Sequence, residues 1–276
     1  MLINSIFRFV TRFGIVLSLL TTTLSSPGFS KNQQSANTQV MRWTVDGVER
    51  EALVYIPATA KTQPTPVIFI FHGHGGNMRE IFRGRGFDQL WPEAITVSPQ
   101  GLNTPGQLVD PKGLLPGWQK APGDQNDRDL HFFDAMLKTL KKDYQVDDKR
   151  IYATGHSNGG GFTYLLWAMR GDVFAAVASS AAIAARELSL LKPKPAMHIM
   201  GENDPLVKPA WQRAMCNQIL RIDNCSSTGE YYAPDATLYK STTGTPVVLY
   251  VHKGRHVYPQ GANAVVIRFF ESITKP

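Results

Sequence analysis

The sequence has few cysteines and no long hydrophobic run, and these two shortages exclude whole classes of protein. Its 276 residues include only two cysteines, Cys216 and Cys225, which excludes a cysteine-rich scaffold and a four-cysteine zinc site. No apolar run reaches the roughly 20 residues that a membrane-spanning helix needs. The pattern G-x-x-x-x-G-K-[ST] is absent as well, so a phosphate-binding loop of that type is excluded.

Acidic residues are slightly outnumbered, but the excess of positive charge is small. The 29 Lys and Arg residues against 22 Asp and Glu residues give a formal net charge of +7. Arg8 and Arg12 lie in a segment that we expect to be removed, which leaves 27 minus 22, or +5, for the mature chain. No nucleic-acid-binding motif accompanies this charge, so we expect no nucleic-acid partner. With 43% hydrophobic residues, the chain can bury a large core without a stabilising metal.

The first thirty residues are typical of an export signal. Two arginines precede a short apolar run over residues 13–24, and the small residues Gly28 and Ser30 offer a cleavage point. We therefore expect a signal peptide over 1–30, a disordered lead-in over 31–40, and no stable membrane insertion after cleavage. An uncleaved anchor is the alternative. The mature protein is expected outside the cell or in the periplasm.

Export would bring the two cysteines into an oxidising compartment. Cys216 and Cys225 are nine positions apart and are the only candidates for a disulfide. We expect them to form a local bridge at the end of a helix, because exported proteins keep disulfides. Two buried free thiols are the alternative.

The remaining residues, 41–276, predict a single α/β domain. An Asp46-Gly47 turn between two alternating runs indicates a hairpin, and the apolar residues 66–71 indicate a strand buried on both faces. Further apolar strands alternate with amphipathic helical segments down to a closing helix over 262–272. This alternation predicts a mostly parallel sheet with helices on both faces.

Gly155-His156-Ser157-Asn158-Gly159 matches the pattern G-x-S-x-G and lies between a predicted strand and a predicted helix. In that context the serine stands on a tight turn that keeps its hydroxyl exposed, and the flanking glycines avoid collisions with neighbouring segments. The pattern therefore predicts Ser157 as a nucleophile. A structural turn serine is the alternative.

A serine nucleophile needs a histidine base and an orienting acid, which follow it in that fold in the order acid, then histidine. Asp204 lies in the loop after the predicted strand 196–200, and Glu202 is its rival. His256 lies in the loop before the closing helix and can swing over the nucleophile, whereas His252 ends a strand. We expect Asp204 and His256 to complete the triad. His198, inside a strand, is expected to be a core residue.

The tetrahedral intermediate of acyl transfer requires two backbone N–H donors. One is expected from Asn158, which follows the nucleophile, and the other from His74 in the Gly-rich loop 72–77. A turn without catalytic role is the alternative for that loop. His72 and His74 have no further cysteine or histidine nearby, so we expect no metal.

With these residues in place, the chain resembles the secreted esterase family that contains polyhydroxybutyrate depolymerases and feruloyl esterases. The resemblance implies an α/β-hydrolase fold and a serine esterase that uses no cofactor. It also assigns Ser157 as nucleophile, Asp204 as acid and His256 as base, with His74 at the second oxyanion donor. The matching segments are FHGHGGN (71–77), SPQG (98–101), PGW (116–118), RIYATGHSNGGG (150–161), GENDPLV (201–207) and GRHVYP (254–259).

The sequence departs from the family's depolymerases at two positions, with His74 where they often have cysteine and Tyr258 where they often have tryptophan. No polymer-binding module is recognisable in the sequence, which favours soluble or loosely bound esters over insoluble polyester.

The expected activity is hydrolysis of hydroxycinnamoyl esters such as feruloylated plant polysaccharide, by a protein that is expected to be a monomer. A polyhydroxyalkanoate depolymerase is the first alternative, and a serine peptidase or a non-catalytic binding protein follows. Trp118 and Tyr258 are expected to line the substrate site, where an aromatic ring can stack on a phenolic acid or a sugar. Trp91, Trp167 and Trp211 are expected to serve packing, and Asp127, Arg128 and Asp129 are expected to form a structural charge cluster.

Overall fold

A computed structural model describes residues 37–106, 109–184 and 186–276. The expected signal peptide lies outside the described residues, as does most of the expected lead-in. The described residues form one compact unit. Its strands are β1 (Thr38–Val45), β2 (Val48–Tyr55), β3 (Thr65–Phe71), β4 (Ile95–Pro99), β5 (Leu102–Asn103), β6 (Pro116–Gly117), β7 (Val146–His156), β8 (Ala176–Ser180), β9 (Ala196–Gly201), β10 (Glu230–Ala233), β11 (Ala236–Tyr239) and β12 (Val247–His252).

The described ranges also contain six α-helices and three short 3₁₀ helices. They are α1 (Met78–Arg85), α2 (Phe87–Leu90), η1 (Asp124–Asp127), α3 (Arg128–Asp143), α4 (Asn158–Arg170), η2 (Gly171–Val173), η3 (Leu188–Leu190), α5 (Pro209–Ile222) and α6 (Ala262–Glu271).

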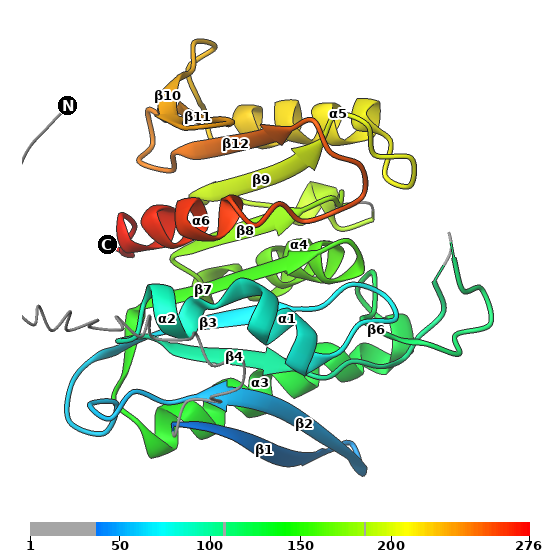
Figure 1. The fold of residues 1–276 in the computed structure, drawn as a ribbon, viewed down its shortest axis with the longest axis vertical. Helices are drawn as coiled ribbons and strands as arrows, with labels where there is room; N and C mark the ends of the chain where they lie inside the picture. The colour runs from blue at the N-terminus through cyan, green and yellow to red at the C-terminus, as the bar shows by residue number, and fades with distance from the viewer. Residues whose placement is uncertain (1–36, 107–108, 185) are drawn as a thin grey trace, which may run out of the picture. The chain divides into compact units, whose positions relative to one another are not determined.

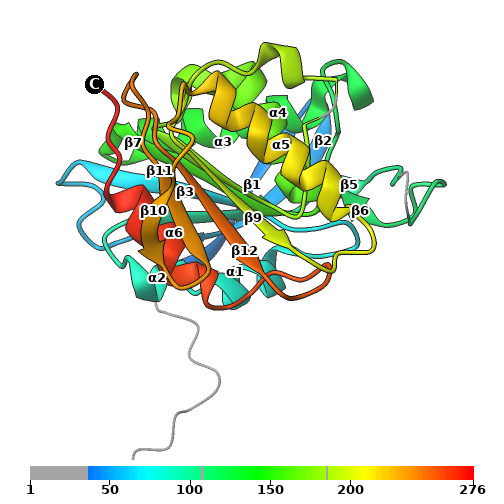
Figure 2. The same ribbon diagram turned by 90° about the horizontal axis from the view of Figure 1, so that it is seen from above.

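Ten strands form one sheet in the order β1-β2-β4-β3-β7-β8-β9-β12-β11-β10 (Figure 1). The six central strands, from β4 to β12, run parallel, and antiparallel hairpins extend the sheet at both edges. The central β3 is buried along its whole length, as its continuous apolar sequence predicts. The helices α3, α4 and α5 cover one face, and α1, α2 and α6 cover the other (Figure 2). The fold is that of an α/β-hydrolase.

Most of the expected elements form where their hydrophobic pattern places them, and two differences stand out. Strand β1 begins at Thr38 and pairs with β2, so residues 38–40 belong to the sheet and not to a disordered lead-in. The hairpin of β10 and β11 was not expected, because its residues 230–239 alternate only weakly. Between β9 and α5, which begins at Pro209, the backbone N–H groups of Leu206 and Val207 bond to Asp204.

The carboxyl ends of the parallel strands carry the loops that form the site. Because parallel strands end at the same edge of the sheet, the segments that follow β3, β7, β9 and β12 converge there. These segments contain His74, Ser157, Asp204 and His256, respectively. Within the described residues, no helix is both long enough and apolar enough to cross a lipid bilayer.

Candidate active site

Ser157 occupies a strained backbone position between β7 and α4. Its φ of 55° and ψ of −119° lie outside the regions that a non-glycine residue normally adopts. Such a conformation costs about 1–3 kcal/mol and persists only where the surrounding structure holds it. Here the Ser157 N–H donates to the carbonyl of Ser180 at the end of β8, over 2.8 Å. The turn therefore holds the hydroxyl above the edge of the sheet.

The glycines around the nucleophile are required by close backbone contacts. A Cβ on Gly155 would lie 2.2 Å from the carbonyl oxygen of Gly159, and a Cβ on Gly159 would lie 2.3 Å from that of Phe71. Both distances are impossible between real atoms, so any side chain at either position would force the turn apart. This is the steric reason expected from the G-x-S-x-G pattern.

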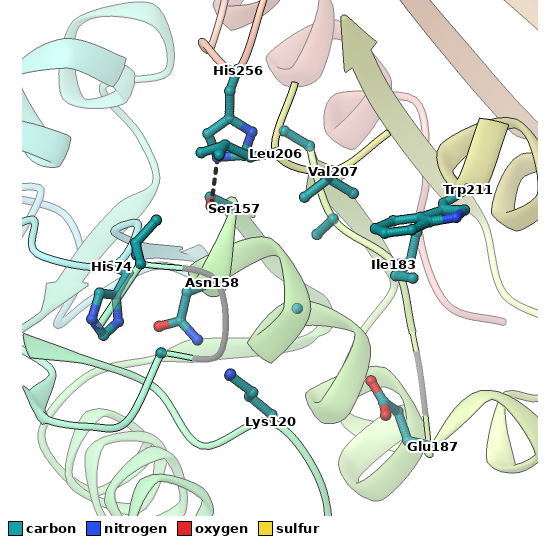
Figure 3. A pocket seen from close by; sticks show the side chains of 15 residues that line it. His74, Lys120, Ser157, Asn158, Ile183, Glu187, Leu206, Val207, Trp211 and His256 are labelled. Atoms are coloured by element: carbon teal, nitrogen blue, oxygen red, sulfur yellow. Dashed lines mark hydrogen bonds between the residues drawn. The ribbon is translucent and has the colours of Figure 1, made fainter. Parts of the chain in front are cut away.

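The structure brings Ser157, His256 and Asp204 into one hydrogen-bonded chain. Figure 3 shows the bond between Ser157 and His256. The His256 Nδ1–H donates to the Asp204 Oδ2 over 2.8 Å, which leaves Nε2 free to accept. The Ser157 hydroxyl then donates to that Nε2 over 2.7 Å. This is the arrangement in which the imidazole can take the hydroxyl proton while the carboxylate stabilises the resulting cation.

The alternative candidates for the acid and the base, Glu202 and His252, do not contact Ser157 or His256 through a hydrogen bond. Glu202 is exposed and forms an ion pair with Arg213 over 3.2 Å. The His252 Nδ1 accepts the N–H of Gly254 at 3.0 Å, and His198 is buried in β9 beside the hydroxyl of Tyr164.

Asp204 is held by four donors, of which the sequence predicts only His256. Its Oδ1 accepts the N–H groups of Leu206 and Val207 at 2.8 and 3.0 Å, and its Oδ2 accepts the Gln212 Nε2 at 3.1 Å beside His256. Both Asp204 and Gln212 are buried. The carboxylate therefore cannot rotate away from the imidazole. Gln212 lies on the inner face of α5, and no motif in the sequence marks it.

Tyr258 does not line the substrate site, contrary to expectation. Its ring packs under the guanidinium of the buried Arg85, whose central carbon lies 3.2 Å from the ring centroid. The ring of His156 stands edge-on to Tyr258 and packs 5.1 Å from the ring of His256, centroid to centroid. Burial lowers the pKa of His156 to about 3, and the Arg85 charge contributes, so His156 stays neutral in this stack. Tyr258 thus packs against His156, which in turn packs against the ring of His256.

His74 and Asn158, the expected oxyanion donors, both line the cavity beside Ser157. The Asn158 N–H lies in the first turn of α4, where helix N–H groups have no acceptor within the helix. The loop that carries His74 passes close to the nucleophile, since a Cβ on Gly73 would lie 3.6 Å from the Ser157 Cβ. Both N–H groups are therefore near the place where an oxyanion would form.

The His74 side chain fastens this loop to the long segment between β5 and β6. Its Nε2 pairs with Asp110 over 3.1 Å, and a Cβ on Gly117 would lie only 2.7 Å from its Nδ1. Burial acts against the ionised form of Asp110. Hydrogen bonds from the N–H groups of Leu115 and Leu114 and from His74 nevertheless lower the pKa of Asp110. A charged carboxylate thus orients the ring.

Trp118 is not a substrate-binding residue, because its side chain has no exposed surface. The ring packs edge-on against Phe71 and stacks on Phe162, with centroids 5.2 and 5.3 Å away. Its indole N–H donates to the carbonyl of His72 over 2.9 Å. Its backbone is paired with the Asn158 amide, which accepts from the Trp118 N–H at 2.6 Å and donates to the Trp118 carbonyl at 3.0 Å. Trp118 therefore supports the oxyanion loop from within the core.

A cavity of about 370 Å³ opens at Ser157, within the range of ligand pockets. Its walls are largely apolar, and Trp211 of α5, which was expected only to pack, stands at the cavity with 45% of its surface exposed. The described residues that line it are His74, Gly106, Val109, Lys120, Ser157, Asn158, Gly161, Ala181, Ala182, Ile183, Glu187, Leu206, Val207, Trp211 and His256.

Two further expectations concern other groups of residues. Cys216 and Cys225 are free thiols, so the expected disulfide is absent. Burial raises the pKa of Cys216, inside α5, to about 12, while the Cys225 Sγ lies 3.6 Å from the carbonyl of Tyr239.

Asp129 is buried in an ion pair with Arg50 over 2.8 Å and accepts the Gln119 N–H, so it is structural, as expected. In the described ranges, no three His, Cys, Asp or Glu side chains are grouped to hold a metal.

Comparison with known proteins places this site among hydrolases. Residues 118–214 match the prolyl oligopeptidase family. The chain is 26% identical to feruloyl esterase D of Neurospora crassa over 245 residues, which cover 84% of this chain and 82% of that protein. It is 33% identical to a probable feruloyl esterase C of Aspergillus niger over 170 residues, 59% of this chain and 56% of that protein.

Solved structures show the same fold at low sequence identity. A ferulic acid esterase from Anaeromyces mucronatus, solved with ferulic acid, has a TM-score of 0.58 at 13% identity and covers 90% of this chain and 96% of its own. An acetyl xylan esterase from Aspergillus awamori has a TM-score of 0.64 at 12% identity, over 84% of this chain and 99% of its own.

Proposed function

We propose that this chain is a serine carboxylic ester hydrolase that cleaves hydroxycinnamoyl esters, such as those that decorate plant polysaccharides. The observation that carries the proposal is the hydrogen-bonded chain from Ser157 through His256 to Asp204. Ser157 and His256 line a largely apolar cavity. The similarity to curated feruloyl esterases supports the choice of ester.

The reaction proceeds in two acyl-transfer steps. His256 Nε2 takes the Ser157 proton as the Ser157 oxygen attacks the ester carbonyl, and Asp204 stabilises the imidazolium that forms. The oxyanion lies on the backbone N–H groups of Asn158 and His74. His256 then gives its proton to the leaving alcohol oxygen, and the acyl group remains on Ser157. Water, deprotonated by His256, attacks this acyl-enzyme, releases the carboxylic acid and restores the Ser157 hydroxyl.

The proposal extends to the place where the enzyme works. Residues 1–30 serve as a cleaved export signal, and the mature chain acts outside the cytoplasm, as a monomer, on esters attached to small molecules or to polymers. A free Cys216 remains compatible with export, because this thiol is buried within a helix, where it is protected from oxidants.

An ester panel tests the substrate class. Methyl ferulate, methyl p-coumarate, 4-nitrophenyl acetate and a hydroxybutyrate trimer are offered separately to the purified mature protein, and kcat/KM is measured for each. We expect the hydroxycinnamates to be hydrolysed about tenfold or more faster than the trimer, because a planar apolar acyl group fills an apolar cavity better.

Faster cleavage of the trimer would instead support a polyhydroxyalkanoate depolymerase. Cleavage of peptides without any ester would contradict the proposal altogether.

A further inference from the structure

The cavity contains one lysine, Lys120, whose ammonium group has no hydrogen-bond partner among the described residues. Lys120 is the only Lys or Arg among the described lining residues, and its side chain points into the cavity (Figure 3). Among the described residues, no hydrogen bond or ion pair engages its Nζ. The Asp124 carboxylate, whose charge favours the ammonium form of Lys120, is itself paired with Arg186 over 2.6 Å.

Partial burial makes the charged form of Lys120 less stable than it would be in water. Burial lowers the pKa of Lys120, and the Asp124 carboxylate opposes that change only in part. Lysine side chains normally extend their charged ends into solvent. A half-buried ammonium that faces an apolar cavity therefore gains most from a ligand oxygen placed beside it.

The two residues that precede Lys120 are held in place by hydrogen bonds. The preceding Trp118 is paired through its N–H and its carbonyl with the Asn158 amide, next to the nucleophile. Gln119 donates its N–H to Asp129 at 2.8 Å, and its side-chain oxygen accepts the Asp129 N–H at 3.0 Å. Lys120 therefore has a defined position relative to Ser157. A residue that selects a substrate by the place of one oxygen atom must be positioned in this way.

The mechanism decides which half of the ester reaches Lys120. The leaving alcohol must lie beside His256, because that imidazole protonates it, so the acyl group extends away from His256. In Figure 3, His256 stands on one side of Ser157 and Lys120 lies on the opposite side, beyond Asn158. The far end of the acyl group therefore points toward the ammonium.

We propose that Lys120 is a specificity-determining residue that donates a hydrogen bond to the para-oxygen of a 4-hydroxycinnamoyl group. This inference rests on the proposed function and names the feature of the acyl group that the site selects. A rigid 4-hydroxycinnamoyl group carries a hydroxyl oxygen at the ring position farthest from the carbonyl. Apolar walls hold the ring, and the ammonium binds the oxygen at its end. Hydrogen bonds to charged groups are stronger than neutral ones, so the preference should be measurable.

The test compares substrates that differ only at this oxygen. For the native enzyme, we expect kcat/KM for methyl ferulate to exceed that for methyl 3,4-dimethoxycinnamate by about tenfold, since the added methyl group crowds the ammonium. In Lys120→Met the ratio should fall to near one, and Lys120→Arg should restore part of it. Lys112→Met removes an exposed charge from the neighbouring loop and should leave the native ratio. Thermal unfolding of each variant checks that it is folded.

A second measurement separates this inference from the proposed function. 4-Hydroxycinnamate and cinnamate are used as competitive inhibitors of 4-nitrophenyl acetate hydrolysis, which does not require that hydroxycinnamate esters be substrates. About tenfold stronger inhibition by the hydroxylated acid, lost in Lys120→Met, supports the inference even if the ester panel fails.

Equal inhibition by both acids in the native enzyme would overturn the inference while leaving the esterase proposal in place. The same follows if Lys120→Met lowers activity on both cinnamate esters to the same extent.

Discussion

Ser157→Ala should lower kcat/KM for methyl ferulate by about 10⁵- to 10⁶-fold while the protein stays folded. The change removes the only atom that can form the acyl-enzyme, whereas the oxyanion donors and the cavity remain and retain weak catalysis. Initial rates measured at high enzyme concentration give the ratio, and thermal unfolding checks the fold. Ser226→Ala, at an exposed serine outside the cavity, is the control and should keep native activity. A Ser157→Ala variant with a tenth of native activity or more would be incompatible with the mechanism.

Asp204→Asn should lower kcat by about 10⁴-fold with little change in KM. The new carboxamide can still accept the N–H groups of Leu206 and Val207, so the loop keeps its shape. Its NH₂ group, however, faces the His256 Nδ1 and donates to it, which places the ring proton on Nε2. The imidazole then cannot accept the Ser157 proton. Steady-state kinetics on methyl ferulate measure the loss.

Glu202→Gln is the matched control, because Glu202 precedes Asp204 by two residues, is exposed and pairs only with Arg213 among the described acids and bases. We expect its kcat to stay within about twofold of native, as for a surface ion pair. The reverse result, a large loss in Glu202→Gln and none in Asp204→Asn, would move the acid to Glu202.

The residues of the triad were predictable because local sequence decides their positions. The glycines around Ser157 leave one possible turn, and the chain order of the fold assigns the acid and the histidine to loops that follow strands. Ser157, Asp204 and His256 therefore lie together as the spacing predicts. The alternation of apolar strands and helices likewise predicts the parallel centre of the sheet.

The residues that the sequence misassigned depend on partners distant in the chain. Trp118 lies in an aperiodic, polar segment that suggests a surface loop, yet His72 and Asn158 satisfy its N–H groups in the core. Tyr258 is turned away from the cavity by Arg85, which pairs with no acid among the described residues and belongs to no motif. Neither contact follows from hydrophobic periodicity, which records only which face of an element is buried. The position of Trp211 at the cavity could not be predicted either, because hydrophobic periodicity does not show which exposed side chains border a cavity.

The most direct measurement of the account is covalent labelling of the folded protein with a fluorophosphonate, followed by peptide mass mapping. The phosphonyl group reacts only with a serine that a neighbouring base activates, so the experiment reads the Ser157–His256 contact without any choice of substrate. We predict a single adduct on Ser157, absent from Ser157→Ala. A folded protein that takes no label, or that carries its label on another serine, would contradict the central claim.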